Sequence, residues 1–261
     1  MHKNQILKSL FSIVIAIYAL MSIGTITMLA IEVDINTTQS TNSTDLKAYG
    51  AEWLTTLNTN EKSAITYYTG PNYVYINQYL RNKRQEIPSG STISKLELED
   101  KIRLIDSAIN KAVLKEDIMV YRNTGEQEFN EEKYFLQPIW GPDFNSLEGI
   151  KNFEDYIKKA IILVQKNINK TYTALAYTST SLQKDSAFGR SAIRMEIKIP
   201  KGAHAPYIDS ISKFKGEKEV LLPRESTFKI TGASTVQERG QNTLIIRTTL
   251  INGSNVNSYN T

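Results

Sequence analysis

The first half of the chain carries apolar residues at helical spacing. After Asp45, the residues Leu46, Tyr49, Trp53 and Leu57 recur every three or four positions, and this spacing predicts an amphipathic helix with one buried face. The same spacing recurs further along the chain, most regularly as a stripe of leucine, isoleucine and alanine residues. It predicts helices over residues 60–69, 72–80, 98–112 and 153–164.

Glycine and proline residues between these segments predict breaks. Gly70 and Pro71 separate the second helix from the third, and residues 87–90 (Ile-Pro-Ser-Gly) predict a loop. A short apolar run at residues 118–122 predicts a strand whose last residue is an arginine. The residues that follow, 123–146, have no regular pattern and predict an irregular segment.

The second half of the chain consists of short runs rich in β-branched and aromatic residues. Turn residues such as Pro200 and Gly202 separate these runs, which is typical of strands. They predict strands over residues 173–177, 192–199, 203–208, 219–222, 227–231 and 244–251. A helical first half followed by a strand-rich second half predicts a single α+β domain.

The N-terminus has the composition of a secretory signal. Lys3 and Lys8 precede an apolar run that extends from residue 10 to residue 30. Because this run is about long enough to cross a bilayer, an uncleaved membrane anchor is the alternative. We therefore expect a signal peptide at residues 1–30, a flexible polar lead-in at residues 31–44 and one domain at residues 45–261.

Composition narrows the function further. The 261 residues are 41% hydrophobic and 22% charged, which is enough to bury one sizeable core. The absence of cysteine excludes disulfides and thiolate metal ligands. Of the two histidines, His2 and His204, a histidine-based triad would have to rest on His204 alone, which argues against this chemistry. Removing residues 1–30, with two lysines and no acids, leaves 29 basic and 27 acidic residues, a net charge of +2. This balance argues against nucleic acid as a partner.

Candidate chemistry gathers in the second half of the chain. A Ser-Thr-Ser triplet at residues 179–181 follows a strand-like run at residues 174–177, and Glu217 and Glu219 stand two positions apart where another strand begins. If that strand includes the residue between them, its period of two places both carboxylates on one face. The alternative is a solvated strand entrance, the common role of an isolated Glu-Lys-Glu.

As an ordered set, an arginine, this triplet and the Glu-x-Glu pair resemble the defining residues of bacterial mono-ADP-ribosyltransferase toxins. Other short motifs are similar to those of the clostridial exoenzymes that modify Rho, and the resemblance spans residues 46–250. It implies an ADP-ribosyltransferase-like α+β domain with two packed, mainly antiparallel sheets. The enzymatic components of binary toxins carry two copies of this fold, whereas this chain has room for one. The motifs are Gly202-Ala203, Tyr207-Ile208-Asp209, Ile211-Ser212, Phe214, Gly216 and Leu221-Leu222-Pro223-Arg224.

The resemblance implies NAD as the co-substrate and no metal. Breaking the bond between nicotinamide and ribose develops positive charge on the sugar, which a fixed carboxylate stabilises. Glu219 matches the catalytic glutamate of the family, and Ser179 matches the serine that orients it. Arg122 matches the arginine that binds NAD, and its planar, charged fork suits a diphosphate.

Several other residues match positions that contact the cofactor in the family. Arg190 and Phe188 lie in a Phe-Gly-Arg loop that is one residue shorter than the Phe-Ala-Gly-Arg of the Rho-modifying enzymes. For Arg81, exposure on a solvated helix is the alternative. The implied cofactor-binding residues are Arg122, Arg81, Arg190, Phe188, Ser179, Thr180, Thr69 and Asn77, with Tyr68 on the adenine side.

The first glutamate of the pair indicates the acceptor. Rho-modifying relatives carry glutamine at the position of Glu217 and modify an asparagine amide. A guanidinium stays protonated in water, so an anionic partner is needed to bind it and draw off proton charge. Glu217 therefore predicts transfer to an arginine, and Phe214 matches an aromatic residue that contacts the protein substrate.

Together these residues predict a secreted, monomeric NAD–protein-arginine ADP-ribosyltransferase. It would act in the host cytosol on a protein such as actin, and would also hydrolyse NAD slowly. One alternative is asparagine modification of a Rho-type GTPase. A second, from a different class, is a non-catalytic binding module of the same fold, against which the joint presence of Arg122, Ser179, Glu217 and Glu219 argues.

Overall fold

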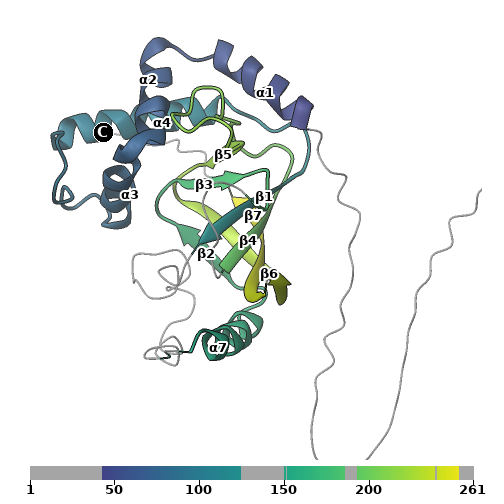
Figure 1. Cartoon of the computed structure of the whole chain (residues 1–261). Helices are drawn as coiled ribbons and strands as arrows, with labels where there is room; N and C mark the ends of the chain where they lie inside the picture. Colours follow the sequence, from purple (N-terminus) through teal and green to yellow (C-terminus); the bar gives the residue numbers. More distant parts are fainter. Residues whose placement is uncertain (1–42, 125–149, 151, 186–192, 239, 253–261) are drawn as a thin grey trace, which may run out of the picture. The chain divides into compact units, whose positions relative to one another are not determined.

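The computed structural model describes residues 43–124, 150, 152–185, 193–238 and 240–252, which form helices and strands (Figure 1). Contacts divide the chain into Met1–Thr37 and Thr38–Thr261, and every described element belongs to the second unit. The predicted signal segment and most of the irregular stretch fall outside the described residues. Among the described helices, none combines the length and the apolar character needed to cross a bilayer.

Reciprocal side-chain caps begin two of the helices. Asn58 accepts the N–H of Glu61, whose carboxylate accepts the N–H of Asn58, and Ser94 and Glu97 form the same reciprocal capping box. Each box satisfies backbone donors that a helix start leaves unpaired. The predicted helices are confirmed as α1 (Ser43–Thr55), α2 (Thr59–Tyr67), α3 (Tyr73–Arg81), α4 (Lys95–Asn110) and α7 (Phe153–Lys166).

A π-helical turn, η1 (Tyr68–Asn72), joins α2 to α3. Gly70 has non-helical backbone angles (φ −89°, ψ −169°) and precedes Pro71, so the predicted break is present as a kink. A Cβ atom on Gly70 would lie 2.9 Å from Cδ of Lys213. The turn η1 therefore packs against the segment that leads to the Glu-x-Glu pair.

The described strands are hydrogen-bonded into one sheet. They are β1 (Ile118–Thr124), β2 (Thr171–Ala174), β3 (Thr178–Ser181), β4 (Ile193–Ile199), β5 (Glu219–Leu222), β6 (Ser226–Glu238) and β7 (Gln241–Asn252). Their order is β2-β6-β7-β4-β1-β3-β5, and all neighbours are antiparallel except β4 and β7, which are parallel. The mixed helices and strands confirm the predicted α+β class.

The sheet is nearly divided between β1 and β3. These strands share only the pair Tyr121–Ser181, whereas β1 pairs with β4 along its whole length. Where the resemblance implied two packed sheets, the seven described strands thus form one sheet whose two parts meet at a single residue pair. The smaller part, β3 with β5, carries Ser179 and Glu219.

Two hydrophobic clusters pack on this framework. The first cluster joins α7 to the large part of the sheet. The second cluster joins the four helices α1, α2, α3 and α4 to the β3–β5 part (Figure 1). Val220 and Leu222 belong to the first cluster and Leu221 to the second. Because successive strand residues point to opposite faces, β5 is buried on both of its faces. Glu219 therefore begins a strand in the interior of the protein.

The predicted strand at residues 173–177 is wrong at its end. Ala174 in β2 pairs with Ser226 at one edge of the sheet, whereas Thr178 in β3 pairs with Leu222 close to the opposite edge. The chain has to leave one strand and cross to another between these two residues. The Ser-Thr-Ser triplet therefore lies within β3 and does not follow the end of an earlier strand.

The predicted strand at residues 203–208 is also wrong. Tyr207 forms an isolated bridge with Val220, and Pro206 accepts the N–H of Leu221 at 3.1 Å. Proline has no N–H to return, so a regular ladder cannot continue through this position. The segment nevertheless lies against β5 and leads directly to Asp209. Three further strands are longer than predicted, because β1 extends to Thr124, β6 extends to Glu238 and β7 begins at Gln241.

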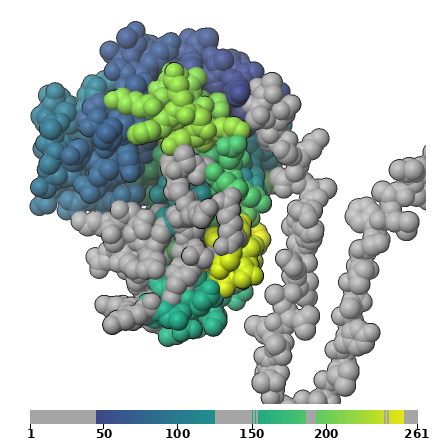
Figure 2. Space-filling view, viewed as in Figure 1, coloured from purple at the N-terminus to yellow at the C-terminus, as the bar shows by residue number. Residues whose placement is uncertain are grey.

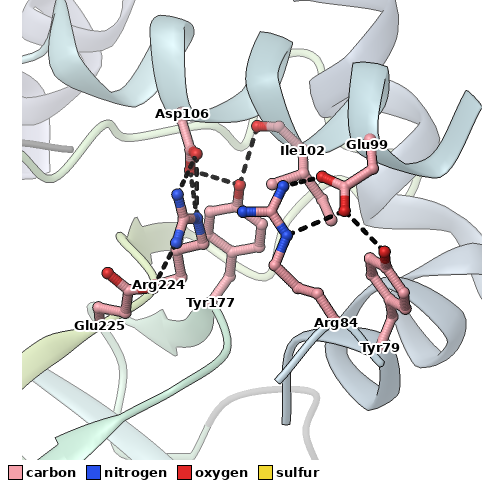
Figure 3. A network of polar contacts seen from close by, with 8 residues as sticks. All are labelled: Tyr79, Arg84, Glu99, Ile102, Asp106, Tyr177, Arg224 and Glu225. Carbon is pink, nitrogen blue, oxygen red and sulfur yellow. Dashed lines mark hydrogen bonds and ion pairs between the residues drawn. The ribbon is translucent and has the colours of Figure 1, made fainter. Parts of the chain in front are cut away.

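A buried polar network ties α4 to the ends of β3 and β5 (Figure 3). Asp106 on α4 accepts hydrogen bonds from Tyr177 Oη at 2.6 Å and from Arg224 Nε at 3.0 Å. Tyr177 directly precedes β3, and Arg224 follows β5 by two residues. Only 1% of the Arg224 side chain and 8% of the Asp106 side chain are exposed. The network therefore anchors the strands that carry Ser179 and Glu219 to the helices.

This network should contribute strongly to stability. We expect Asp106→Ala to lower the free energy of unfolding by about 3–5 kcal/mol. The substitution removes the buried carboxylate that pairs with the buried Arg224 guanidinium and leaves the pair with Glu225 (Figure 3). Urea denaturation measures the change. Glu52→Ala is the matched control, since it removes an ion pair with Lys115 whose side chains are both mostly exposed, and should cost less than about 1 kcal/mol. Equal losses in the two variants would contradict this role.

Candidate active site

Glu219 and Ser179 come together because β5 pairs with β3. The register places Ser179 opposite Leu221 and Ser181 opposite Glu219. Glu219 is only 4% exposed, and its carboxylate interacts with the hydroxyl groups of Ser179 and Ser212 through hydrogen bonds. The contact between the predicted catalytic glutamate and the serine predicted to orient it is therefore present in the fold.

The surroundings of Glu219 favour its neutral form. Burial is the largest cause and raises the pKa of Glu219 from 4.5 to about 7, and the nearby negative charges of Glu217 and Asp209 act in the same direction. Hydrogen bonds from Ser179 and Ser212 act in the opposite direction by stabilising the carboxylate. A carboxyl with a pKa near neutrality in a buried position is typical of a functional site.

Glu217 lies beside Glu219 for a reason other than strand periodicity. The strand β5 begins at Glu219, and Lys218 has a φ of +50°, so the period-two argument does not apply to this pair. Glu217 is instead in a turn, where its carbonyl oxygen accepts a hydrogen bond from Ser181 Oγ at 2.7 Å. Burial, and then the charge of Asp209, raise the pKa of Glu217. Glu217 is close enough to Glu219 for its charge to raise the pKa of Glu219.

Arg122 reaches the same place from β1. Its Nη1 atom donates a hydrogen bond of 3.1 Å to the carbonyl oxygen of Ser179, and its side chain is half-buried. The single β1–β3 pair brings the two strands together at this point. The guanidinium is therefore next to the residue that contacts Glu219.

Tyr68 is a central residue that the sequence placed only on the adenine side. Its hydroxyl accepts a hydrogen bond from Asn77 Nδ2 at 3.1 Å and also interacts with Ser179. Burial raises the pKa of Tyr68 to about 12, so its hydroxyl stays protonated at neutral pH. The Oδ1 atom of Asn77 is buried and has no hydrogen-bond partner among the described residues. A ligand with a donor group would suit this position.

Two predicted cofactor contacts have other roles in the described structure. Thr180 is fully buried, and its hydroxyl donates to the carbonyl oxygen of Val220 at 2.7 Å, which holds β3 to β5. The hydroxyl of Thr69 donates to the carbonyl oxygen of Thr66 and accepts the N–H of Lys213, both at 3.1 Å. Thr69 thus connects η1 to the segment before Glu217, and a contact of either threonine with NAD stays a prediction.

The predicted substrate-recognition residue Phe214 is on the surface. Its side chain is 52% exposed, and its N–H donates to Ser212 Oγ at 3.1 Å. Figure 2 shows the light-green segment around residue 210 on the surface beside the blue helical segment. Arg81, at the end of α3, is half-buried and engaged in an interaction. Phe188 and Arg190 lie outside the described residues, so their roles stay predictions.

Asp209 and Ser181 are site residues to which the sequence assigned no role. Oδ1 of Asp209 accepts the N–H groups of Gly216 and Lys218, and Ser181 holds the carbonyl of the residue between them. The sequence feature that could have pointed to Asp209 is its place close to a glycine-containing turn, because aspartate often accepts backbone N–H groups in turns. Such a signal does not identify which turn is bound, because the partners lie seven and nine residues away.

The site combines a buried carboxylate, hydroxyl donors, an arginine and a second carboxylate near an exposed aromatic residue. This set can stabilise positive charge on a sugar, bind a phosphate group and receive a cationic side chain. Among the described residues, no group of three or more histidine, aspartate and glutamate side chains could hold a metal ion. The side chains present fit NAD as a substrate, and a contact of Arg122 with its diphosphate stays a prediction.

Comparison with known proteins agrees with this geometry. Residues 46–253 match the family model of the ADP-ribosyltransferase exoenzymes. The mono-ADP-ribosyltransferase C3 of Hathewaya limosa is 32% identical over 216 residues, which cover 81% of this chain and 78% of that protein.

Solved structures show the same likeness. The toxin Plx2a of Paenibacillus larvae is 30% identical with a TM-score of 0.62, covering 80% of this chain and 96% of that one. BECa, the ADP-ribosylating toxin of a Clostridium perfringens binary enterotoxin, solved with NADH, has the same identity and TM-score, covering 80% of this chain and 47% of its own. This chain therefore belongs to the ADP-ribosyltransferase exoenzyme family.

Proposed function

We propose that this protein is a secreted toxin that transfers ADP-ribose from NAD to an arginine side chain of a host protein and releases nicotinamide. The observation that carries the arginine assignment is the position of Glu217. It lies close enough to raise the pKa of Glu219, and it is held in a turn that also leads to the exposed Phe214. The acceptor and the sugar would then meet between two carboxylates with different tasks.

The sugar side of the reaction is assigned to Glu219 and Ser179. As the bond between nicotinamide and ribose breaks, positive charge develops on the sugar, and the ionised Glu219 stabilises it. Its hydrogen bond with Ser179 fixes the carboxylate in one orientation. Arg122 would hold the diphosphate of NAD, and the family uses NAD as its substrate. Water in place of the acceptor would give slow hydrolysis of NAD.

The acceptor side is assigned to Glu217. A protonated guanidinium carries no free electron pair for attack, and an anion beside it binds it and takes up proton charge as the new bond to the sugar forms. Neutral glutamine at this position could bind an amide, but could not accept a proton. Glu217 therefore supports arginine as the acceptor.

Asparagine modification of a Rho-type GTPase is the second candidate. It is favoured by the likeness to the C3 enzyme and by the motif Tyr207-Ile208-Asp209. The pair Glu217 and Glu219 favours the arginine acceptor, for which we propose a target such as actin. Residues 1–30 support secretion, and the predicted cleavage near Ala30 is part of the proposal. A non-catalytic module is disfavoured because the predicted catalytic side chains lie together.

One experiment distinguishes these candidates. The mature protein is incubated with labelled NAD and a host-cell lysate, and the modified side chain is mapped by mass spectrometry. Label on arginine supports the proposal, and label on asparagine supports the Rho alternative. If neither label nor free nicotinamide appears, while NAD or a protein partner still binds, the non-catalytic module is supported.

Arg122→Lys should weaken NAD binding. A lysine keeps the positive charge but cannot make the two-pronged contact of a guanidinium with a diphosphate, so we expect affinity to fall on the order of 10-fold. Calorimetric titration with NAD measures the change. Arg103→Lys, at an exposed arginine paired with Asp100 on α4, is the control and should leave affinity unchanged. Equal affinity in both variants would place the diphosphate elsewhere.

The rate of NAD cleavage should depend on pH near neutrality. Only the ionised form of Glu219 stabilises the sugar cation, so the rate should rise with pH and reach half its maximum near pH 7. Nicotinamide release between pH 5 and 9 measures the profile. Ser212→Ala should move the midpoint to higher pH, because it removes a hydrogen bond that lowers the pKa of Glu219. A profile that is flat between pH 5.5 and 8 would contradict this assignment.

A further inference from the structure

We infer that Asp209 is a positioning residue that shapes the turn carrying Glu217 and supplies a second negative charge, after that of Glu217, beside Glu219. This inference rests on the proposed function, since it concerns the same site. Asp209 follows the non-strand segment that lies against β5, and it is half-buried. Nothing in the predicted catalytic set assigns it a task, although it contacts the turn at two points.

The geometry shows how Asp209 holds the turn. Its Oδ1 atom accepts the N–H of Gly216 at 2.9 Å and the N–H of Lys218 at 2.8 Å, the residues on either side of Glu217. Both residues have positive φ values, +93° for Gly216 and +50° for Lys218. A lysine in this region costs free energy, so it persists only where neighbouring bonds hold it. One carboxylate oxygen therefore helps to keep the turn in its left-handed form.

Asp209 also acts through its charge. Its negative charge is a cause of the raised pKa of both Glu217 and Glu219. The other groups around Glu219 are known: β3 contributes Ser179, the segment before the turn contributes Ser212, and η1 contributes the neutral Tyr68. The positive Arg122 of β1 acts on Tyr68 and donates to the carbonyl of Ser179.

These two effects have different consequences for the reaction. The charge of Asp209 holds the proton on Glu219 up to a higher pH, which affects every reaction that needs ionised Glu219. The bonds to the turn position Glu217, which affects only transfer to a protein side chain. A variant that removes the charge but keeps an acceptor oxygen therefore separates the effects, and asparagine has the same shape as aspartate.

The test compares Asp209→Asn and Asp209→Ala with the wild type. For Asp209→Asn we expect the pH midpoint of nicotinamide release to fall by about 0.5–1 unit, because one like charge beside Glu219 is lost. For Asp209→Ala we expect the ratio of arginine transfer to NAD hydrolysis to fall on the order of 10-fold, because the turn loses both bonds.

Asp117→Asn is the matched control. Asp117 also accepts a backbone N–H, that of Lys201 at 2.9 Å, but it belongs to an exposed segment and takes no part in the site. This variant loses the same charge from the protein and should leave both the midpoint and the ratio unchanged. Thermal melts of all variants establish that each is folded at the assay temperature.

The outcomes separate this inference from the proposed function. If Glu219→Gln remains active, the proposed function fails whatever Asp209 does. If Glu219→Gln is inactive while Asp209→Asn keeps the wild-type midpoint, the inference about Asp209 alone is overturned. If Asp209→Asn does not fold, Asp209→Glu replaces it in the test. The longer glutamate side chain should misplace the turn and lower the ratio of arginine transfer to NAD hydrolysis. An unchanged ratio would overturn the inference.

Discussion

Glu219→Gln is expected to abolish both ADP-ribose transfer and NAD hydrolysis while leaving the affinity for NAD nearly unchanged. The amide keeps the size and hydrogen-bonding capacity of the carboxylate, but it cannot stabilise a positive sugar by charge. Losing one well-placed electrostatic stabiliser costs on the order of 100- to 1000-fold in rate. Nicotinamide release and label on protein measure the two reactions, and calorimetric titration measures NAD binding.

The same variant should be more stable than the wild type at alkaline pH. The pKa of Glu219 is about 7 in the folded protein, above the ordinary 4.5 of a glutamate, so the folded state binds more protons between these values. Its contribution to stability is therefore present below pH 4.5 and is lost as the pH rises through 7. Above pH 7 the buried charge costs up to about 3 kcal/mol, and Glu219→Gln removes this cost.

Urea denaturation of the wild type and Glu219→Gln at pH 5 and pH 8.5 tests this stability prediction. We expect the variant to gain about 1–3 kcal/mol over the wild type at pH 8.5 and much less at pH 5. A stable, folded variant with no activity would show that Glu219 serves catalysis at the expense of stability. Near wild-type turnover in Glu219→Gln would exclude Glu219 as the catalytic carboxylate.

Glu217→Gln is expected to remove transfer to arginine but to spare much of the slow hydrolysis of NAD. Glu219 still stabilises the sugar cation, and water needs no anionic partner to take up the charge of a guanidinium. We expect arginine labelling to fall on the order of 100-fold or more, with nicotinamide release reduced by less than about 10-fold. The carbonyl of Glu217, which Ser181 binds, is unchanged by the substitution.

Both products are measured side by side on a purified acceptor protein and in its absence. The variant recreates the Gln-x-Glu pair of the Rho-modifying exoenzymes next to Tyr207-Ile208-Asp209, so a Rho-type GTPase is included as a second acceptor. Glu116→Gln is a suitable control, because Glu116 is an exposed residue between α4 and β1. If arginine labelling persists at near wild-type rate in Glu217→Gln, Glu217 does not face the acceptor, and the arginine assignment fails.

The sequence by itself determined the local elements and the identity of the main site residues. Helices α1 to α4 and α7 follow from apolar spacing, because this pattern connects residues three or four positions apart. Gly70 and Pro71 marked the kink correctly for the same reason. Arg122, Ser179 and Glu219 were found through their likeness to a family, and the fold brings the three together.

Tertiary structure alone decided how these residues are held. Glu217 lies outside β5, and its position depends on Asp209 and Ser181, whose partners are distant in sequence. Tyr68 joins the site because η1 packs against the segment before the turn. Periodicity describes only neighbours along the chain. Burial, like charge and hydrogen bonds between distant segments set the pKa of Glu219, and these appear only when the chain has folded.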